Sequence, residues 1–286
     1  MDQIIQKLEK NISNSEKNKS SYWKKYLNQN TEYKDIFNPD IRIGKFQVKN
    51  HFSFIHNFFL KIIFGYEIFN SQSYRLYKSV FDLSKRRLDI NTMRHILTFE
   101  LLKKYIDPKR ICIIGDGGLN AVLGAHLNFP GAKIFSVNLS ESHIHEYLIL
   151  KNLNYDLKNS VKLIDNINEN LDNNLLYLVP SNLKNFLLNK KIDLFINIAS
   201  FQEMSVDEIE AYFDIIKNNK SYLYTCNREL KILPNGDQIY FEKYPWGDCK
   251  YLFIENCNFH QKYYSLKFPF IKKYDGNHKH AFAKFD

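Results

Sequence analysis

From residue 110 onward, short apolar runs alternate with amphipathic segments, and this alternation constrains the fold more than any other feature. The apolar runs cover residues 110–114, 133–139, 175–179, 192–198 and 221–226. Segments with helical spacing fill the intervals, over residues 119–128, 142–153, 182–188 and 206–218. Strands that alternate with helices form a parallel sheet with helices on both faces. The sequence therefore predicts an α/β fold with a mainly parallel sheet.

The first part of the chain has a different pattern. Residues 1–105 have mainly helical spacing of apolar side chains, as at Ile96, Phe99 and Leu102. Asp107-Pro108 ends this part, because the residue before a proline disfavours helix. We therefore expect a helical N-terminal cap over residues 1–105 and the α/β domain over residues 106–286.

The last part of the chain loses the helical signal after residue 227. The turn sequence Pro234-Asn235-Gly236-Asp237 separates two β-rich runs and predicts a hairpin. The final runs, residues 258–268 and 278–285, are expected to form a closing antiparallel strand pair.

Composition limits the class of protein. With 286 residues, 44% of them hydrophobic, the chain can bury a large core. Its formal net charge of +9 suits a nucleic acid, an anionic membrane surface or a phosphorylated small substrate, or simply a solvated lysine-rich surface. The basic residues are scattered rather than clustered, which argues against a nucleic-acid partner.

Cysteine usage and hydropathy indicate a cytoplasmic protein without a membrane span. The four cysteines form no C-x-x-C pair, and two lie in strand-like apolar runs, as expected of reduced thiols; they are Cys112, Cys226, Cys249 and Cys257. Residues 1–19 are polar and do not resemble a signal peptide. Polar residues interrupt the apolar stretch 52–69, which predicts a core helix or a partner-facing one.

A glycine-rich turn follows the first predicted strand. Gly115-Asp116-Gly117-Gly118 has the strand–glycine–helix order of a ligand-binding loop, although a plain tight turn is the alternative. A dinucleotide fingerprint would need a third glycine where Asn120 stands, and no P-loop lysine follows. The acidic residue expected after the second strand is replaced by Asn138, whose amide could bond a ribose diol.

A second polar segment follows the predicted strand 192–198. It reads Ser200-Phe201-Gln202-Glu203-Met204. Ligands of open α/β sheets bind outside the carboxyl ends of the strands, so this segment is expected to face the same crevice as the glycine turn. Ser205 and Glu208 instead have the spacing of a helix capping box.

Together these segments resemble S-adenosylmethionine-dependent methyltransferases, specifically the sugar O-methyltransferases of bacterial surface-polysaccharide gene clusters. The matching segments are residues 114–124 (IGDGGLNAVLG), 197–204 (NIASFQEM), 208–213 (EIEAYF), 222–230 (YLYTCNREL) and 244–248 (YPWGD), with a weaker match at 20–27 (SSYWKKYL). The resemblance covers roughly residues 20–285. It implies a Rossmann-like methyltransferase fold, with a mainly parallel seven-stranded sheet and an antiparallel terminal strand.

The resemblance also implies a cofactor, S-adenosylmethionine, and a set of residues that bind it. These are Gly115, Asp116, Gly117, Asn120, Asn138, Ser200 and Gln202. The cofactor has no pyrophosphate, so the third fingerprint glycine is not required, and Gly115 and Gly117 allow the backbone to approach it closely. Asp116 could pair with the ammonium group of the cofactor or cap the following helix.

The implied reaction is methyl transfer to a hydroxyl of a nucleotide-activated sugar, for capsule or lipopolysaccharide synthesis. A general base must take the hydroxyl proton. Glu203 is the first candidate, although it could instead bind a sugar hydroxyl. His278 is the second candidate. His278 and His280 share one face of a predicted strand, so they could also bind a divalent metal or form a plain surface pair.

Candidate acceptor-binding residues lie later in the chain. Trp246 and Asp248 could stack on and hydrogen-bond a sugar, or could belong to a packed turn. Arg228 could bind the diphosphate charge, as could Arg86, Arg87 and Arg94. The rival functions are an RNA or other small-molecule methyltransferase and a non-catalytic partner subunit. A homo-oligomer is a further expectation that the sequence leaves open.

Overall fold

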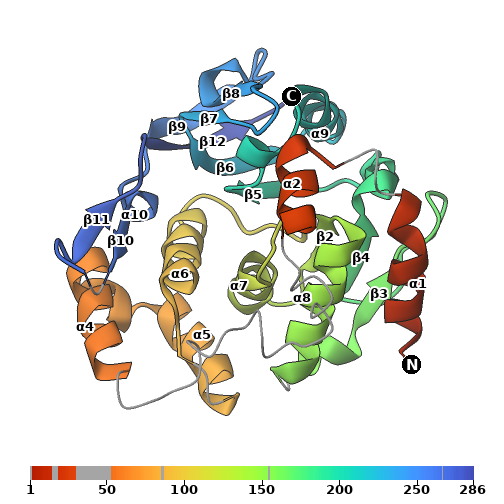
Figure 1. The fold of residues 1–286 in the computed structure, drawn as a ribbon. Helices are drawn as coiled ribbons and strands as arrows, with labels where there is room; N and C mark the ends of the chain where they lie inside the picture. The colour runs from red at the N-terminus through yellow and green to blue at the C-terminus, as the bar shows by residue number, and fades with distance from the viewer. Residues whose placement is uncertain (1, 15–18, 30–52, 85–86, 154, 266) are drawn as a thin grey trace.

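The computed structural model describes residues 2–14, 19–29, 53–84, 87–153, 155–265 and 267–286 (Figure 1). A central eight-stranded sheet organises the described residues. In spatial order its strands are β3 (Val161–Leu163), β4 (Leu176–Pro180), β2 (Lys133–Asn138), β1 (Arg110–Ile114), β5 (Leu194–Ile198), β6 (Tyr222–Arg228), β12 (His278–Lys284) and β9 (Lys250–Asn256).

The pairings confirm the predicted fold class. All neighbouring strands from β3 to β6 pair in parallel. Strand β12, the last in the chain, runs antiparallel to both β6 and β9. The described sheet has one strand more than the seven that the resemblance implied, because the short β3 adds an edge beside β4.

Helices cover both faces of this sheet. The helices of the described residues are α1 (Gln3–Asn11), α2 (Ser21–Gln29), α4 (Ser53–Phe64), α5 (Gln72–Leu83), α6 (Ile90–Leu102), α7 (Asn120–Asn128), α8 (Ser140–Asn152), α9 (Val206–Asn218) and α10 (Asn258–Gln261). Short 3₁₀ turns are η3 (Glu67–Asn70), η4 (Asp156–Asn159), η5 (Ser181–Leu187), η6 (Phe201–Glu203) and η7 (Phe241–Lys243). The predicted helix 182–188 is therefore the 3₁₀ segment η5.

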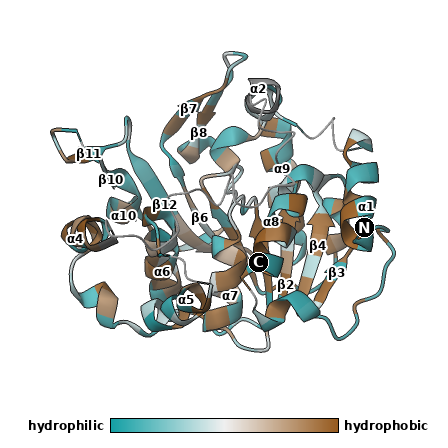
Figure 2. Ribbon diagram, turned by 60° about the horizontal axis from the view of Figure 1, so that its bottom comes forward, coloured by the Kyte–Doolittle hydropathy of each residue, from teal (hydrophilic) through white to brown (hydrophobic). Residues whose placement is uncertain are grey.

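Strand residues divide the core into two parts. In β1, Ile111 and Ile113 belong to the cluster beneath α5, α6 and α7, while Cys112 and Ile114 belong to the cluster beneath α9. Alternate side chains of a strand point to opposite faces, and a strand covered on both faces is apolar throughout. Figure 2 shows this apolar character along β2 and β4. The continuous apolar runs in the sequence therefore have their physical cause in two-sided burial.

The described helices of residues 1–105 pack onto the sheet rather than around a core of their own. Leu8 of α1, Tyr77 of α5 and Phe99 of α6 share one buried cluster with Ile111 of β1. Helix α1 lies beside α8 near the β3 edge, and α2 lies over the carboxyl ends of the strands (Figure 1). The predicted division at residue 105 therefore separates helical from α/β segments within a shared core.

The C-terminal strand pairing differs from the expectation. Residues 258–268 do not pair with β12; they form α10 and β10 (Lys262–Tyr264), which pairs with β11 (Ile271–Lys273). Strand β12 finds its partners in β6 and β9 instead. The predicted hairpin at residues 234–237 is confirmed, since it joins β7 (Leu230–Ile232) to β8 (Gln238–Tyr240).

The apolar stretch 52–69 contains helix α4. Its inner side buries His56 and Leu60, while Phe54, Phe58 and Ile62 are exposed on its outer side. Among the helices of the described residues, none is both long and apolar enough to cross a membrane. The interpretation of this stretch as a core-facing helix is confirmed for its inner side.

Close packing of α7 against α5 and α6 gives a stability prediction. A methyl group at Gly124, within α7, would overlap the Tyr77 hydroxyl and the Phe99 ring. Alanine normally stabilises a helix relative to glycine by about 1 kcal/mol. Here we expect Gly124→Ala to lower the free energy of unfolding by roughly 1–3 kcal/mol, because overpacking outweighs propensity.

Urea denaturation of Gly124→Ala beside Gly117→Ala measures this effect. No atom lies within 4 Å of a methyl group built at Gly117, so the control should unfold close to wild type. A Gly124→Ala variant as stable as the control would contradict the packing argument.

Candidate functional site

The turn after β1 is locked to the end of β5 by one hydroxyl group. Gly115 has φ +78°, and a Cβ there would overlap the Ser200 side chain, so the position requires glycine. Ser200 Oγ donates to the Ile114 carbonyl over 3.0 Å and accepts from Asn197 Nδ2 at 2.6 Å. The glycine turn and the segment after β5 therefore meet at one point, as the sequence predicted.

Asn197 extends this contact to a third strand. Its amide lies fully buried in β5 and donates to the Ile114 carbonyl at 3.2 Å. Its oxygen accepts from Asn227 Nδ2, in β6, at 2.8 Å. Asn197 was not among the predicted site residues, although an amide inside the apolar run 192–198 is a readable signal of a buried polar network.

Asp116 caps helix α7. One carboxylate oxygen accepts from the backbone N–H of Asn120 at 3.1 Å, and the other accepts from Val122 at 2.8 Å. A carboxylate at a helix N-terminus satisfies otherwise unpaired donors and interacts favourably with the helix dipole. Of the two alternatives open for Asp116, the structure therefore shows capping.

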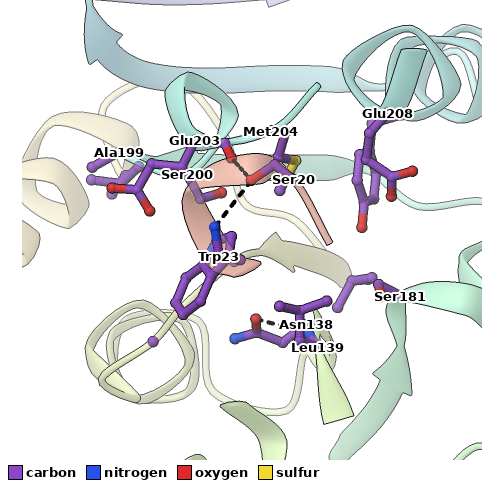
Figure 3. A pocket seen from close by; sticks show the side chains of 15 residues that line it. Ser20, Trp23, Asn138, Leu139, Ser181, Ala199, Ser200, Glu203, Met204 and Glu208 are labelled. Carbon is purple, nitrogen blue, oxygen red and sulfur yellow. Dashed lines mark hydrogen bonds between the residues drawn. The ribbon is translucent and has the colours of Figure 1, made fainter. Parts of the chain in front are cut away.

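Two adjoining cavities meet at the glycine turn. The first, of about 250 Å³, is lined by Trp23, Asn138, Ser181 and Glu203 among others (Figure 3). In Figure 3 the Trp23 ring and the Asn138 amide lie on neighbouring sides, and Ser181 and Glu208 lie across from them. The second, of about 330 Å³, is lined by Arg94, His95, Asn120 and His260 among others. Both cavities are bordered by Gly115, Gly117, Ile198 and Ala199.

Asn138 has a structural reason to be an amide. It ends β2, donates through Nδ2 to Glu146 Oε1 at 2.8 Å, and accepts from the N–H of Leu139. Glu146 is fully buried, bonds His143 at 2.8 Å, and has a pKa raised by burial. An acid at position 138 would place a second carboxylate against Glu146, and the two charges would repel. This explains why the expected acidic residue is missing.

Ser181 offers an unused polar group to the first cavity. Its hydroxyl is buried and has no hydrogen-bond partner among the described residues. A buried hydroxyl left unpaired costs free energy, so a ligand that bonds it is favoured. This residue was not among the predicted site residues, because an isolated serine after a strand carries no distinctive pattern.

The N-terminal segment closes one side of the first cavity. Lys19 forms a buried ion pair with Glu141 at 2.5 Å, and Ser20 Oγ donates to the Glu203 carbonyl. Trp23 of α2 lines the cavity directly. None of these residues was predicted as part of the site, although the weak family match at residues 20–27 was the signal that could have found Ser20 and Trp23.

Glu203 is a half-buried carboxyl group that lines the first cavity. Burial raises the pKa of Glu203 to about 7; Lys231, a hydrogen bond from Tyr22 and the charge of Arg228 oppose the shift in part. A carboxyl with this pKa exchanges its proton near neutral pH. Its neighbour Gln202 is committed elsewhere, because Gln202 Oε1 accepts from the N–H of Arg228 at 2.7 Å. Gln202 lines neither cavity and holds η6 to the end of β6.

His278 stands at the same edge of the sheet, opposite Arg228 in the β6–β12 register. Burial, with the charges of Arg228 and Arg94, lowers the pKa of His278 to about 4. Its Nδ1 lies 3.4 Å from Gln261 Oε1. Among the described residues that line the two cavities, His278 is not found.

The predicted sugar-binding pair lies apart from both cavities. Trp246 is buried, donates to the Phe241 carbonyl at 3.1 Å, and packs edge-on against Phe213 at 5.3 Å between ring centres. Its ring is therefore part of the core. Asp248 is exposed, and neither residue is among the described residues lining the cavities.

Of the predicted arginines, Arg94 lines the second cavity. Arg94 is 6% exposed, and its guanidinium donates to Asn91 Oδ1 and to the Lys262 carbonyl, each at 2.8 Å. Its Nε is buried and, within the described part of the chain, has no hydrogen-bond partner. Arg228 lies over the Tyr274 ring at 5.9 Å. Of the other predicted arginines, Arg86 lies outside the described residues, and Arg87 does not line this cavity.

Sequence comparisons give no assignment. No family model matches the chain, and no curated protein matches it.

Comparison with solved structures finds methyltransferases at low similarity. A candidate O-methyltransferase from Nostoc punctiforme is 12% identical, with a TM-score of 0.41 over 65% of this chain and 54% of that one. A SAM-dependent methyltransferase from Aquifex aeolicus is 12% identical, with a TM-score of 0.40 over 65% and 88%. The O-methyltransferase TomG from Streptomyces achromogenes is 11% identical, with a TM-score of 0.41 over 66% and 78%. The chain thus spans about half the length of the first of these proteins, and at such TM-scores the site itself must support any function.

The raised pKa of the half-buried Glu203 carboxyl predicts a pH-dependent stability change. Its folded-state pKa of about 7 exceeds the unfolded value of 4.5, so the folded protein binds the proton more tightly. The charged carboxylate therefore destabilises the fold increasingly as pH rises from 4.5 to 7. We expect Glu203→Gln to stabilise the protein at pH 8 by roughly 2 kcal/mol more than at pH 5.

Urea denaturation at the two pH values measures this difference. The matched control is Glu210→Gln, at an exposed position of α9, which should show a much smaller change between pH 5 and pH 8. An equal effect of both substitutions would show that the Glu203 carboxyl is not desolvated.

Proposed function

We propose that this chain is an S-adenosylmethionine-dependent O-methyltransferase that acts on a saccharide hydroxyl, carried as a nucleotide-activated sugar for capsule or lipopolysaccharide. The observation that carries the proposal is the pair of cavities that adjoin at one glycine turn. A two-substrate transfer needs two neighbouring sites that meet at a reaction point. The sequence resemblance at residues 114–124 and 197–204 supports the identity of the donor.

The first cavity fits the donor. Gly117 is exposed to open space, so a ligand can approach the backbone there. The unpaired Ser181 hydroxyl and the Asn138 amide would bind polar groups of the nucleoside, and Trp23 would contact its base. Asp116 is occupied as a cap, so it is no longer our candidate partner for the ammonium group. When bound, the cofactor supplies an electrophilic methyl group on a sulfonium.

Glu203 is the residue to which we assign proton removal, from an acceptor hydroxyl that reaches past the glycine turn into the first cavity, which Glu203 lines. Its pKa of about 7 lies where a general base works well, whereas the pKa of about 4 at His278 makes that imidazole a weak base. Ser20 holds the backbone of Glu203, and Tyr22 bonds its carboxyl group. Positioning of donor and acceptor in line can supply ~7–11 kcal/mol of the barrier reduction.

The second cavity fits a polar, negatively charged acceptor. Arg94 presents a buried guanidinium with an unused Nε among the described residues, and His95 and Asn120 add hydrogen-bonding groups. Arg228 lies at the same edge of the sheet. Guanidinium groups bind phosphate oxygens well, which favours a diphosphate-linked sugar. An RNA acceptor is the alternative, and the same assay distinguishes it.

Cofactor binding can be tested at Gly117. Isothermal titration calorimetry should detect binding of S-adenosylhomocysteine to the wild-type protein and no binding of NAD. Gly117→Val should abolish the binding, because the new side chain would fill the space beside the turn. The unfolding midpoint of the variant should stay within a few degrees of wild type. Binding of NAD alone would overturn the donor assignment.

Catalysis can be tested at Glu203. Transfer of a radioactive methyl group should occur to a nucleotide sugar, and not to RNA. Glu203→Gln should lower kcat by about 10²-fold or more with little change in cofactor affinity. The wild-type kcat should rise with pH through about 7, because the base must lose its proton. His278→Asn is the matched variant and should have a smaller effect; the reverse order would move the role to His278.

A further inference from the structure

Two cysteines and one histidine converge beside the second cavity. Cys226 comes from β6, while Cys257 precedes α10 and His260 lies within it. One donor atom from each residue lies within 4.8 Å of the other two. All three side chains are buried, with 0%, 1% and 5% of their surface exposed. Among the described residues, these three form the group of His, Cys, Asp and Glu side chains that could hold a metal ion.

The spacing of the donors suits a tetrahedral ion. Zinc bonds sulfur at about 2.3 Å and imidazole nitrogen at about 2.0–2.1 Å, so tetrahedral ligand atoms lie roughly 3.5–3.8 Å apart. The observed limit of 4.8 Å permits such contacts with small adjustments. Two thiolates also cancel the charge of a divalent cation. The neutral complex would not be repelled by the nearby Arg94 guanidinium. Thiolate and imidazole ligands together favour zinc over magnesium or calcium.

His260 supplies an independent indication of a missing ligand. Its Nε2 is buried and has no hydrogen-bond partner in the described part of the structure. A buried imidazole nitrogen without a partner is costly, and a metal bond would satisfy it. The same ring lines the second cavity, so an ion bound to it would lie at the cavity wall.

Groups around the three residues would support such an ion. The His280 ring and the backbone N–H of His260 lie beside the Cys257 sulfur, as does the Cys226 thiol. His280 is held in turn by the Tyr224 hydroxyl at 3.2 Å. Outer partners of this kind orient the ligands of a metal site. The sequence suggested His278 and His280 as a metal-binding pair. Neither belongs to the three-residue group.

We propose that Cys226, Cys257 and His260 bind a zinc ion, with its fourth coordination position open to the second cavity. Three protein ligands with one open position are typical of reactive zinc sites, whereas structural sites use four. The proposal concerns metal binding by these residues and holds whether or not the chain transfers methyl groups.

The first test uses the full-length wild-type protein, without an affinity tag and in reducing buffer with added zinc. After dialysis, elemental analysis should find one zinc ion per chain. X-ray absorption should give two sulfur neighbours at about 2.3 Å and nitrogen or oxygen neighbours at about 2.0–2.1 Å. Retention of no zinc, or a zinc shell without sulfur, would overturn the proposal. A Cys226–Cys257 disulfide in protein prepared under reducing conditions would overturn it as well.

The second test compares variants of the proposed ligands with a control variant. Cys226→Ser and His260→Gln should weaken zinc binding by more than the ~10–100-fold that loss of an outer partner causes. Cys249→Ser is the matched control, because Cys249 lies outside the three-residue group and should bind zinc as the wild type does. Equal zinc affinity in all three variants would refute the site. If a variant fails to fold, the wild-type absorption spectrum still decides the question.

Discussion

The buried amide of Asn197 is the interaction on which the candidate site depends. It joins the carboxyl ends of β1, β5 and β6 through the Ile114 carbonyl, the Ser200 hydroxyl and the Asn227 amide. A buried polar network whose members are all bonded is rigid and specifies one arrangement, because breaking any bond leaves a desolvated group unpaired. The strand ends that bear the glycine turn are thereby held in a fixed relation.

This network fixes the position of the walls of both cavities. Ser200 presses against Gly115, so the turn must lack a side chain and its backbone faces the cavities. Asn227 holds the N–H of Gln202, and Gln202 in turn holds the N–H of Arg228. Glu203 follows Gln202 in the chain, so its backbone is held in place where its side chain meets the first cavity. Buried amides behind the walls therefore fix where the lining residues of the cavities lie.

Much of the fold could be read from the sequence because its signals are local. Two-sided burial makes the strands continuously apolar, and the glycine turn follows directly from one of them. Roles that depend on distant partners could not be read in this way. Trp246 and Gln202 look like ligand-binding residues in isolation, yet one packs against Phe213 and the other bonds Arg228. The capping role of Asp116 was one of two local options that only geometry could separate.

The proposed metal-binding group of Cys226, Cys257 and His260 shows how one wrongly predicted secondary-structure element can conceal a site. Residues 258–268 were expected to be a strand. If Cys257 continued that strand, Cys257 and His260 would point to opposite faces, since side chains alternate along a strand. In the structure this segment begins as the short helix α10, with Cys257 as its N-cap, and Cys257 and His260 come together there. Cys226 approaches them from β6, and it lies 31 positions before Cys257 in the chain.

The N-terminal segment is likewise held by a partner that is distant in sequence. Lys19 and Glu141 are far apart in the chain, yet each is buried against the other. Removing either partner would leave a buried charge unpaired, so this ion pair holds the N-terminal segment against the wall of the first cavity.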